Sequence, residues 1–315
     1  MDFAPLGTTA LTTSVIGVGA GGPSRLGLQG GAEEDAALVV IRAALEQGVN
    51  FIDTTEAYGT EEIVGRALAE VPRETVIVST KISHWEDLDA AGIERAVDER
   101  LRLLGIDYVD ILHLHAVTRE KYDRAVSEAY PGLLRAKEAG KVRLTGVTEM
   151  FNADPGHRML ERAVADGLWD VIMVGFNLMN QSARERVIAP AAARGMGILD
   201  MFAVRLALSR RERLVEVMSE LLEDGRVDRA VLEECGGTPE DPLGWVVRET
   251  DAQTLPEAAY RFVRHEPGIH VTLSGTGSVD HMRENIMSVQ KPPLDPAVTA
   301  KLRRLFAGVD SVTAQ

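Results

Sequence analysis

Eight short, β-rich apolar segments recur along this chain, and helical patterns follow most of them. The segments are Val15–Gly19, Asn50–Asp53, Thr75–Thr80, Val109–His115, Arg143–Val147, Val171–Phe176, Gly197–Phe202 and His270–Ser274. A repeated strand-then-helix unit indicates a parallel sheet, because parallel neighbours must be joined by a crossover connection. Eight such strands are the number that closes a (β/α)8 barrel. We therefore predict an α/β fold of the TIM-barrel type.

The segments between these strands carry apolar residues at three- and four-residue spacing, which is typical of helices that cover a sheet. The predicted helices are Glu33–Gln47, Glu61–Leu68, Ala90–Leu104, Val126–Ala139, Ala153–Asp166 and Ser182–Arg194. Glycines stand where a left-handed residue would end a helix. They are Gly48, Gly105, Gly140, Gly167 and Gly195.

The 315 residues exceed the ~250 of a typical barrel, and the excess falls in one place. We predict an insertion at about 205–255, after the seventh strand, containing a helix at Arg210–Leu222 and a loop at Gly236–Glu240. A helix at Pro256–His265 follows it. Such an insertion is either a surface decoration or a lid over a site at the carboxyl face of the barrel.

The two ends of the chain complete the predicted barrel. Pro5–Thr8 and the threonine-rich Thr9–Thr13 predict a short β-hairpin that plugs the barrel bottom, and Pro293–Ala307 predicts a closing helix. No repeat beyond the strand-helix period is visible. We therefore expect residues 1–315 to form a single barrel domain.

The net charge of −14 argues against nucleic acid as a partner, because phosphate contacts require clustered Lys and Arg. The charge permits either a monomer or a symmetric oligomer. The single cysteine, Cys235, has no intrachain disulfide partner, and its expected role is a small buried side chain. No signal peptide and no apolar run of the ~18 residues that a membrane span needs is visible. We expect a cytoplasmic protein that acts on small molecules.

Polar residues converge at the ends of three consecutive predicted strands. Asp53 ends the second strand, with Tyr58 in the loop just beyond it, while Lys81 follows the third strand and His115 ends the fourth. Each residue alone could have a structural role. Carboxyl ends of barrel strands meet on one face, however, and barrel chemistry occurs on that face. We therefore predict that these four residues form a catalytic site.

These four side chains form a plausible proton-transfer site. An ammonium group beside Tyr58 favours the phenolate and would lower the pKa of the phenol, and Asp53 would keep Lys81 charged. Tyr58 could then give a proton to a carbonyl oxygen or take one from an alcohol, with His115 hydrogen-bonded to the same oxygen. The matching hydride on carbon implies a nicotinamide cofactor, since no side chain supplies one.

The sequence resembles the aldo-keto reductase family over nearly its whole length. Matching motifs are Pro5-Leu6-Gly7, Ile16-Gly17-Val18-Gly19, Phe51-Ile52-Asp53-Thr54, Tyr58-Gly59 with Glu61, Ser79-Thr80-Lys81, Asp107–Asp110 running to His115, Gly140-Lys141, Gly146-Val147, and Gly275 through Glu284-Asn285. The tetrad of that family falls on Asp53, Tyr58, Lys81 and His115. The resemblance implies a (β/α)8 barrel and reversible, usually NADPH-dependent, carbonyl reduction. Asp107–His115 is similar to the sugar-dehydrogenase branch, which includes L-galactose dehydrogenase.

The resemblance also implies a dinucleotide site at the carboxyl face. Its predicted contacts are Gly19, Thr148, Glu149, Met173, Met201, Gly275, Thr276, Gly277, His281, Glu284 and Asn285. The sequence departs from the family pattern at several of them. Thr148-Glu149 replaces Ser-Asn, Met173 replaces a common Gln, and Met201 replaces an aromatic residue. Glu149 either lies beside the nicotinamide, where it would favour the oxidised ring, or it points outward or caps a helix.

The phosphate-binding end of this predicted site is the loop Ser274–Ser278, which opens the predicted helix Val279–Gln290. Many NADPH-preferring relatives carry Lys or Arg here, whereas this chain has Gly275 and His281. We therefore expect NADP(H), and possibly NAD(H), as the cofactor. Arg205, Arg210 and Arg211 are either a pyrophosphate clamp or a solvated helix start.

The predicted substrate contacts lie on the loops after the third and fifth strands. They are His84, Trp85, Met150 and Phe151. An aromatic wall suits a sugar face and an aryl carbonyl equally well. His113 precedes His115 by two residues, so it points to the same side one layer deeper, and we expect it to be structural.

The predicted function is an NAD(P)(H)-dependent oxidoreductase that interconverts a carbonyl and an alcohol, with Tyr58 as general acid/base. One alternative is a non-catalytic, cofactor-sensing or regulatory barrel, which the altered cofactor positions permit. Another is a metal-dependent sugar isomerase, but Lys81 would repel a cation among Asp53, His115 and Glu149. We expect no metal.

Overall fold

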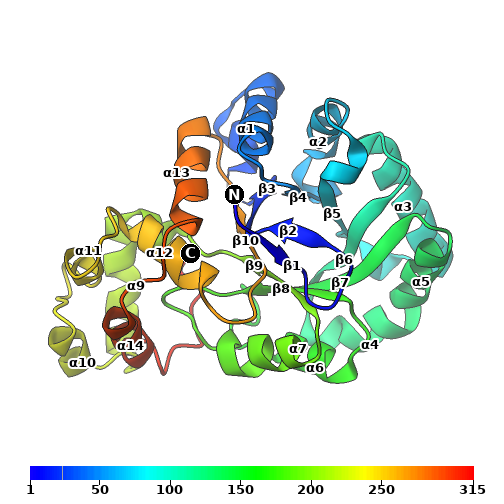
Figure 1. Cartoon of the computed structure of the whole chain (residues 1–315). Helices are drawn as coiled ribbons and strands as arrows, with labels where there is room; N and C mark the ends of the chain where they lie inside the picture. Colours follow the sequence, from blue (N-terminus) through cyan, green and yellow to red (C-terminus); the bar gives the residue numbers. More distant parts are fainter. Residues whose placement is uncertain (23) are drawn as a thin grey trace.

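In the computed structural model, which describes residues 1–22 and 24–315, eight parallel strands form a closed barrel (Figure 1). The strands are β3 (Ile16–Gly19), β4 (Phe51–Asp53), β5 (Ile77–Ile82), β6 (Val109–Val117), β7 (Val142–Glu149), β8 (Val171–Gly175), β9 (Gly197–Met201) and β10 (Val271–Ser274). Each strand pairs with the next along the chain, and β10 closes the barrel on β3, with Thr272 opposite Ile16. The predicted (β/α)8 barrel is confirmed.

Helices surround this barrel (Figure 1). They are α1 (Glu34–Glu46), α2 (Glu61–Leu68), α3 (Ala90–Leu104), α4 (Tyr122–Arg124), α5 (Tyr130–Glu138), α6 (Arg158–Asp166), α7 (Ala189–Ala193), α12 (Leu255–Arg264), α13 (Val279–Val289) and α14 (Pro296–Leu305). All five glycines predicted to end helices have positive φ. The helix predicted from Ala153 instead begins at Arg158, because His157 is left-handed, with φ 63°.

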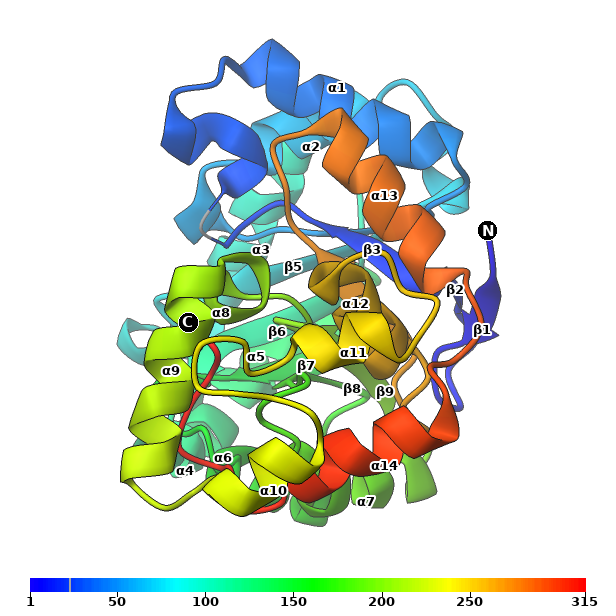
Figure 2. The same cartoon turned by 90° about the vertical axis from the view of Figure 1, so that its left-hand side faces the viewer.

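The N-terminal hairpin consists of β1 (Phe3–Pro5) and β2 (Thr12–Ser14), paired antiparallel. Its turn places Leu6 inside the barrel, fully buried, where it contacts Gly197 at the start of β9. The amide of Thr8 donates a hydrogen bond to the carbonyl oxygen of Gly195. The hairpin therefore closes the amino end of the barrel, while α8 and the C-terminus lie at the opposite end (Figure 2).

The insertion after β9 is helical. It contains α8 (Leu206–Ser209), α9 (Arg211–Glu223), α10 (Arg229–Glu234) and α11 (Gly244–Arg248). The predicted helix corresponds to α9, whereas α10 and α11 are too short to leave a clear periodic pattern. The predicted loop at Gly236–Glu240 is not helical. α8 and α11 pack on α12, and α10 packs on α14, so the insertion covers one flank of the barrel.

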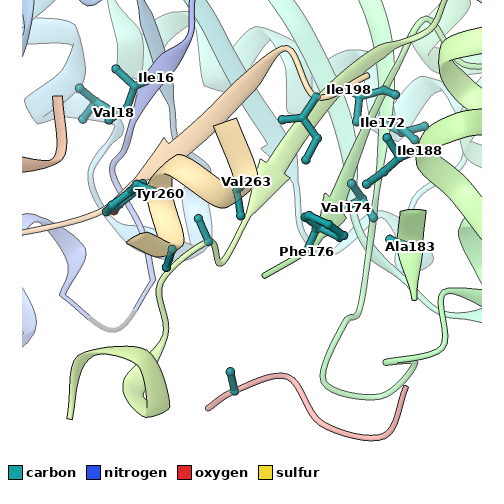
Figure 3. Packing of buried hydrophobic residues seen from close by; sticks show 14 of the residues in the cluster. Ile16, Val18, Ile172, Val174, Phe176, Ala183, Ile188, Ile198, Tyr260 and Val263 are labelled. Carbon is teal, nitrogen blue, oxygen red and sulfur yellow. The ribbon is translucent and has the colours of Figure 1, made fainter. Parts of the chain in front are cut away.

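Two apolar layers follow from the alternation of side chains along each strand. One layer fills the barrel interior; it consists of Leu6, Phe51, Ile77, Ile111, Val171, Met173, Leu199 and Val271. The other joins the strands to the helices, as Ile172 and Val174 of β8 do beside Ile188 (Figure 3). Because the interior is filled, a ligand site can form only at the ends of the strands.

None of the helices within residues 1–22 and 24–315 has an apolar stretch long enough to span a lipid bilayer.

Candidate active site

A buried ion pair joins the ends of β4 and β5. The Nζ atom of Lys81 lies 2.5 Å from Oδ2 of Asp53 and donates a second hydrogen bond to the carbonyl oxygen of Thr54 at 3.0 Å. Ser79 donates to Oδ1 of Asp53 at 2.8 Å. Lys81 is 1% and Asp53 3% exposed, so both charges depend on these contacts in place of water.

Tyr58 and His115 complete the group of four. Tyr58 lies in a single 3₁₀ turn, Glu56–Tyr58, which follows β4, and its ring centroid is 5.1 Å from Nζ of Lys81. The ring of His115, on β6, meets it edge-on at a centroid distance of 5.9 Å and an angle of 88°. The structure thus brings the four predicted catalytic residues together at three neighbouring strands.

The electrostatics of this group differ from the sequence prediction in one respect. Burial disfavours the charge on Lys81, but the Asp53 carboxylate and Tyr58 together raise the pKa of the ammonium, which stays protonated. Burial also raises the pKa of Tyr58, and the opposing effect of Lys81 does not outweigh it. Lys81 thus acts on the pKa of Tyr58 in the predicted direction, but burial has the larger effect, and Tyr58 is a phenol at neutral pH.

His115 is neutral in this site. Burial, followed by the charges of Lys81 and His84, lowers the pKa of its ring to about 3. Its Nδ1 atom lies 2.7 Å from Oγ of Ser83, and its carbonyl oxygen accepts a hydrogen bond from the indole of Trp85 at 3.0 Å. His115 is therefore held from both its ring and its backbone.

A second polar network lies behind the four residues and was not predicted from the sequence. Arg100 of α3 bridges two carboxylates, with Nε 2.8 Å from Oε2 of Glu61 and Nη1 3.4 Å from Oε2 of Glu56. Thr80 donates to the other oxygen of Glu61 at 2.8 Å. In the sequence, only the polar run Thr54-Thr55-Glu56 between Asp53 and Tyr58 indicates such a network, because three polar residues beside a buried strand need hydrogen-bond partners.

On the opposite side of the barrel mouth, the inner faces of β7, β8 and β9 end in one hydroxyl side chain and two methionines. Thr148 of β7 accepts a hydrogen bond from the amide of Ala116 at 2.7 Å. Met173 belongs to the interior layer, and Met201 packs against that layer from the end of β9. The three side chains share the inner face, where a nicotinamide contact was predicted for them.

Glu149 points the other way. Alternation along β7 places it on the outer face, where its carboxylate lies 3.0 Å from Nδ1 of His157 and accepts the amide of Gly175 at 2.8 Å. The side chain is fully buried. Of the two interpretations of Glu149 from the sequence, the structure matches the outward-pointing side chain, and the position beside the nicotinamide is wrong.

Two of the four residues in the loop between β10 and α13 are glycines that lie close to other backbone segments. A Cβ on Gly277 would lie 2.4 Å from Cα of Gly27, and one on Gly275 would lie 3.0 Å from the carbonyl oxygen of Gly19. Ser278 caps α13 by accepting the amide of His281. The predicted contacts Thr276 and Asn285 are half-buried, whereas His281 and Glu284 are exposed. Backbone amides at this helix start can hold a phosphate.

A row of flat groups crosses the ends of β7 and β9. The ring of His157 stacks on Phe151 at 5.2 Å, and Phe151 stacks on Phe202 at 6.2 Å. The guanidinium of Arg205 lies 4.1 Å from the centroid of the Phe202 ring. The row links the start of α6 to the start of α8.

Arg205 is the one member of the predicted arginine group that is buried. It donates to the side chains of Asn152 and Gln315 at 2.9 and 2.8 Å, and burial lowers the pKa of the guanidinium to about 10. Among the described residues it has no carboxylate partner. Arg210 and Arg211 are exposed, which matches the solvated helix start.

The predicted substrate contacts divide into two pairs. His84 and Met150 are exposed, whereas Trp85 and Phe151 are only 1% and 2% exposed. Trp85 and Phe151 therefore do not form an open wall in this conformation, and the sequence prediction is wrong in that respect. Trp85 points into the protein, where its indole N–H donates a hydrogen bond to the carbonyl oxygen of His115.

Two further residues agree with their expected structural roles. His113 is fully buried against Gly146, where a Cβ would lie 2.2 Å from its ring, and Cys235 is 1% exposed. Within the residues that the structure describes, no three His, Cys, Asp or Glu side chains are placed to share a metal ion.

The chain is similar to known proteins both in sequence and in fold. The sequence profile of the Aldo/keto reductase family matches residues 15–306. The chain is 29% identical to "L-galactose dehydrogenase" of Arabidopsis thaliana, over 92% of this chain and 88% of that protein. It is 25% identical to "NADH-specific methylglyoxal reductase" of Escherichia coli, over 92% and 94%. The fold is similar to the holo form of an aldo-keto reductase from Bacillus halodurans, with a TM-score of 0.72, 22% identity and coverage of 97% and 96%.

Proposed function

Because this chain belongs to the aldo/keto reductase family, we propose that it is an NAD(P)(H)-dependent oxidoreductase that interconverts a carbonyl compound and its alcohol, with Tyr58 as general acid/base. The observation that carries the proposal is the buried Lys81–Asp53 pair beside Tyr58. A structural ion pair alone would not require a phenol and a neutral imidazole at the same barrel mouth.

The four side chains have separate tasks in this proposal. Tyr58, a phenol at neutral pH, donates its proton to the carbonyl oxygen as the alcohol forms. The ammonium of Lys81 stabilises the phenolate that results, and Asp53 holds that ammonium in place. His115 is neutral, so it orients the oxygen by a hydrogen bond without adding a charge.

The residues around the barrel mouth fit a dinucleotide. The loop 274–278 leaves a phosphate access to backbone amides at the start of α13, and Arg205 is a buried cation without a carboxylate partner among the described residues. Thr148 and Met201 lie on the inner face for the nicotinamide. When bound, that cofactor supplies or takes the hydride.

The choice between NADP(H) and NAD(H) depends on the 2′-phosphate. The stretch 274–281 contains no Lys or Arg, and its one basic side chain, His281, is exposed. Arginine would hold a phosphate at neutral pH, but histidine is only partly charged. We propose that the chain accepts both NADP(H) and NAD(H), since no Lys or Arg of this stretch is available to select for the 2′-phosphate.

The substrate in this proposal is a small carbonyl compound or alcohol. The names of the two relatives reported above point to aldoses and to small aldehydes as the first compounds to screen. A cytoplasmic location, without nucleic-acid or membrane partners, is consistent with the acidic composition.

Dinucleotide binding and turnover test the proposal in one series. NADPH and NADH are titrated against wild-type protein and Tyr58→Phe, with Trp fluorescence as the signal. Both proteins are expected to bind, and only wild type should reduce aldehydes, aryl ketones or aldoses. Binding of neither dinucleotide below millimolar concentration would instead favour a non-catalytic barrel, in which the changes at Met173 and Met201 have removed the cofactor site.

A further inference from the structure

Four arginine side chains surround one open cavity beside α6. The cavity has a volume of about 510 Å³ and is lined by Arg119, Gly156, Arg158, Glu161, Arg162 and Arg186. Arg119 follows β6, and two of the arginines belong to α6. The fourth, Arg186, lies in the helical segment Arg184–Ile188 that leads into α7. Three segments far apart in the sequence therefore bring positive charge to the same place.

The charge of this cavity is opposite in sign to the charge of the whole chain. The chain carries a net charge of −14, so its average surface repels an anion. Salt screens charges that lie more than ~8 Å apart at physiological ionic strength, and a ligand in the cavity therefore interacts mainly with the lining groups. Those groups are four guanidinium ions and one carboxylate. The cavity therefore attracts anions.

Two of the four arginines are held in place by the protein. Arg162 forms an ion pair with Asp123. Arg186 donates hydrogen bonds to the carbonyl oxygen of Gly156 at 3.1 Å and to the carboxylate of Asp310 at 3.0 Å. These contacts fix the walls of the cavity, so a ligand does not have to order both side chains when it binds.

The charges of the other two arginines are not matched by the protein. Arg119 and Arg158 are exposed, and within the described part of the chain neither forms an ion pair or donates a side-chain hydrogen bond. A guanidinium presents a fork of N–H donors that fits phosphate oxygens. The amide of Met159 at the start of α6 already donates to Asp154 at 2.8 Å. The groups available to a ligand are therefore side chains and not the end of the helix.

The lining residues distinguish among anions. A carboxylate is planar and is satisfied by one guanidinium, whereas a phosphoryl group has three oxygens that can meet several. Glu161 lines the same cavity and pairs with none of the four arginines in the structure described for residues 1–22 and 24–315. Its carboxylate repels a phosphoryl group but accepts hydrogen bonds from hydroxyl groups. The cavity therefore fits a ligand that carries a phosphoryl group at one end and hydroxyl groups at the other.

We propose that this cavity binds a sugar phosphate, with the phosphoryl group at Arg119 and Arg158 and the sugar hydroxyls at Glu161. The volume is within the range of about 300–1,000 Å³ that small-molecule sites occupy. None of the lining residues belongs to the predicted catalytic, dinucleotide or substrate contacts. The cavity is therefore a second site, and its occupation does not require the proposed oxidoreductase function.

Calorimetric titration in phosphate-free buffer tests the choice of ligand, with glucose 6-phosphate, inorganic phosphate and glucose as probes. Wild type is expected to bind glucose 6-phosphate more tightly than phosphate, and glucose not measurably. The Kd for glucose 6-phosphate should rise with salt, because the arginines that bind it are exposed. No binding of glucose 6-phosphate below millimolar concentration, or binding no tighter than that of phosphate, would overturn the proposal.

Two substitutions test the position of the ligand. Arg119→Gln and Arg158→Gln each remove a charge without an ion-pair partner among the described residues, so the Tm should not change. Each should weaken the Kd for glucose 6-phosphate at least about tenfold, through the lost charge-assisted hydrogen bonds. Arg95→Gln is the matched control, because Arg95 is an exposed arginine of α3 that does not line the cavity. If both cavity variants bind like wild type, the proposal is wrong.

A third substitution separates hydroxyl recognition from general attraction of anions. Glu161→Ala removes a negative charge from the cavity, so it should tighten the binding of inorganic phosphate. It should also reduce the preference for glucose 6-phosphate over phosphate, because the acceptor for the sugar hydroxyls is lost. If the affinities for both ligands rise by the same factor, Glu161 does not contact the sugar and the assignment to a sugar phosphate is wrong.

The same variants separate this site from the proposed active site. Arg119→Gln and Arg158→Gln should keep the NADPH affinity and the turnover of wild type, because neither residue belongs to the predicted contacts at the barrel mouth. A different result would place the ligand at the dinucleotide site and overturn the proposal: glucose 6-phosphate binding that NADPH or Arg205→Met abolishes while both cavity variants retain it. Failure of wild type to turn over any carbonyl compound would refute the oxidoreductase function alone.

Discussion

The ring of Tyr58 occupies the space that a side chain on Gly21 would need: a Cβ there would lie 2.1 Å from Cε2 of the ring. Gly21→Ala should therefore displace Tyr58 from Lys81 and lower kcat by about 10²-fold, since a shift of about 1 Å can cost that much. The rate of carbonyl reduction measures the loss of kcat, and thermal unfolding shows that the variant is folded. Gly30→Ala is the control, because nothing lies within 4 Å of a Cβ there; equal activity in the two variants would refute the steric argument.

Glu61 makes the stability of the protein depend on pH. Burial raises the pKa of its carboxyl from 4.5 to about 7, so the folded state holds a proton that the unfolded chain has lost between these values. Stability should therefore fall as pH rises from 4.5 to 7, by about 3 kcal/mol in total. Urea unfolding at pH 5 and pH 8 should show this loss in wild type and in the exposed control Glu62→Gln. Glu61→Gln should lack it, and a full loss in that variant would contradict the assignment.

Glu149 is predicted to stabilise the fold without selecting a cofactor form. Glu149→Gln weakens a buried hydrogen bond with His157 and should lower the free energy of unfolding by about 1–3 kcal/mol. The ratio of NADPH to NADP⁺ affinities should stay unchanged, because the carboxylate lies on the outer face of β7. Denaturant titration and fluorescence binding measure the two quantities, and a changed affinity ratio would return Glu149 to the cofactor site.

Arg205 should contribute to dinucleotide binding, whereas Arg210 should not. Arg205→Met removes a buried cation, and a lost charge-assisted hydrogen bond of about 1.5–3 kcal/mol corresponds to a ten- to hundredfold weaker Kd for NADPH. Arg210→Ala changes an exposed side chain and should leave the Kd unchanged. If both variants bind NADPH as tightly as wild type, Arg205 serves only its structural contacts with Phe202, Asn152 and Gln315.

The sequence was sufficient to predict the barrel and the four converging residues. Both depend on local patterns: strands alternate with helices at a regular spacing, and Asp53, Lys81 and His115 each stand at a strand end. Parallel strands in a barrel all point the same way, so strand-end residues are neighbours even when they are far apart in sequence. No side-chain packing had to be known.

The errors arise where packing decides. Trp85 and Phe151 were expected to be accessible, but a hydrogen bond to His115 and a stack on His157 bury them. The pKa of Tyr58 depends on how much water reaches the phenol, which a sequence does not specify. Glu149 was left with two orientations because its partner, His157, comes into reach only through a left-handed turn before α6.

The row of flat groups from His157 to Arg205 has a mechanical consequence. His157 precedes α6 and Arg205 precedes α8, so the stacked rings of Phe151 and Phe202 connect the starts of these two helices through side-chain contacts. Among the described residues no such stack holds Tyr58, which lies in a single 3₁₀ turn on the other side of the barrel opening. We therefore expect ligand binding to displace the side of the barrel mouth that bears Tyr58 more than the side that carries the stacked rings.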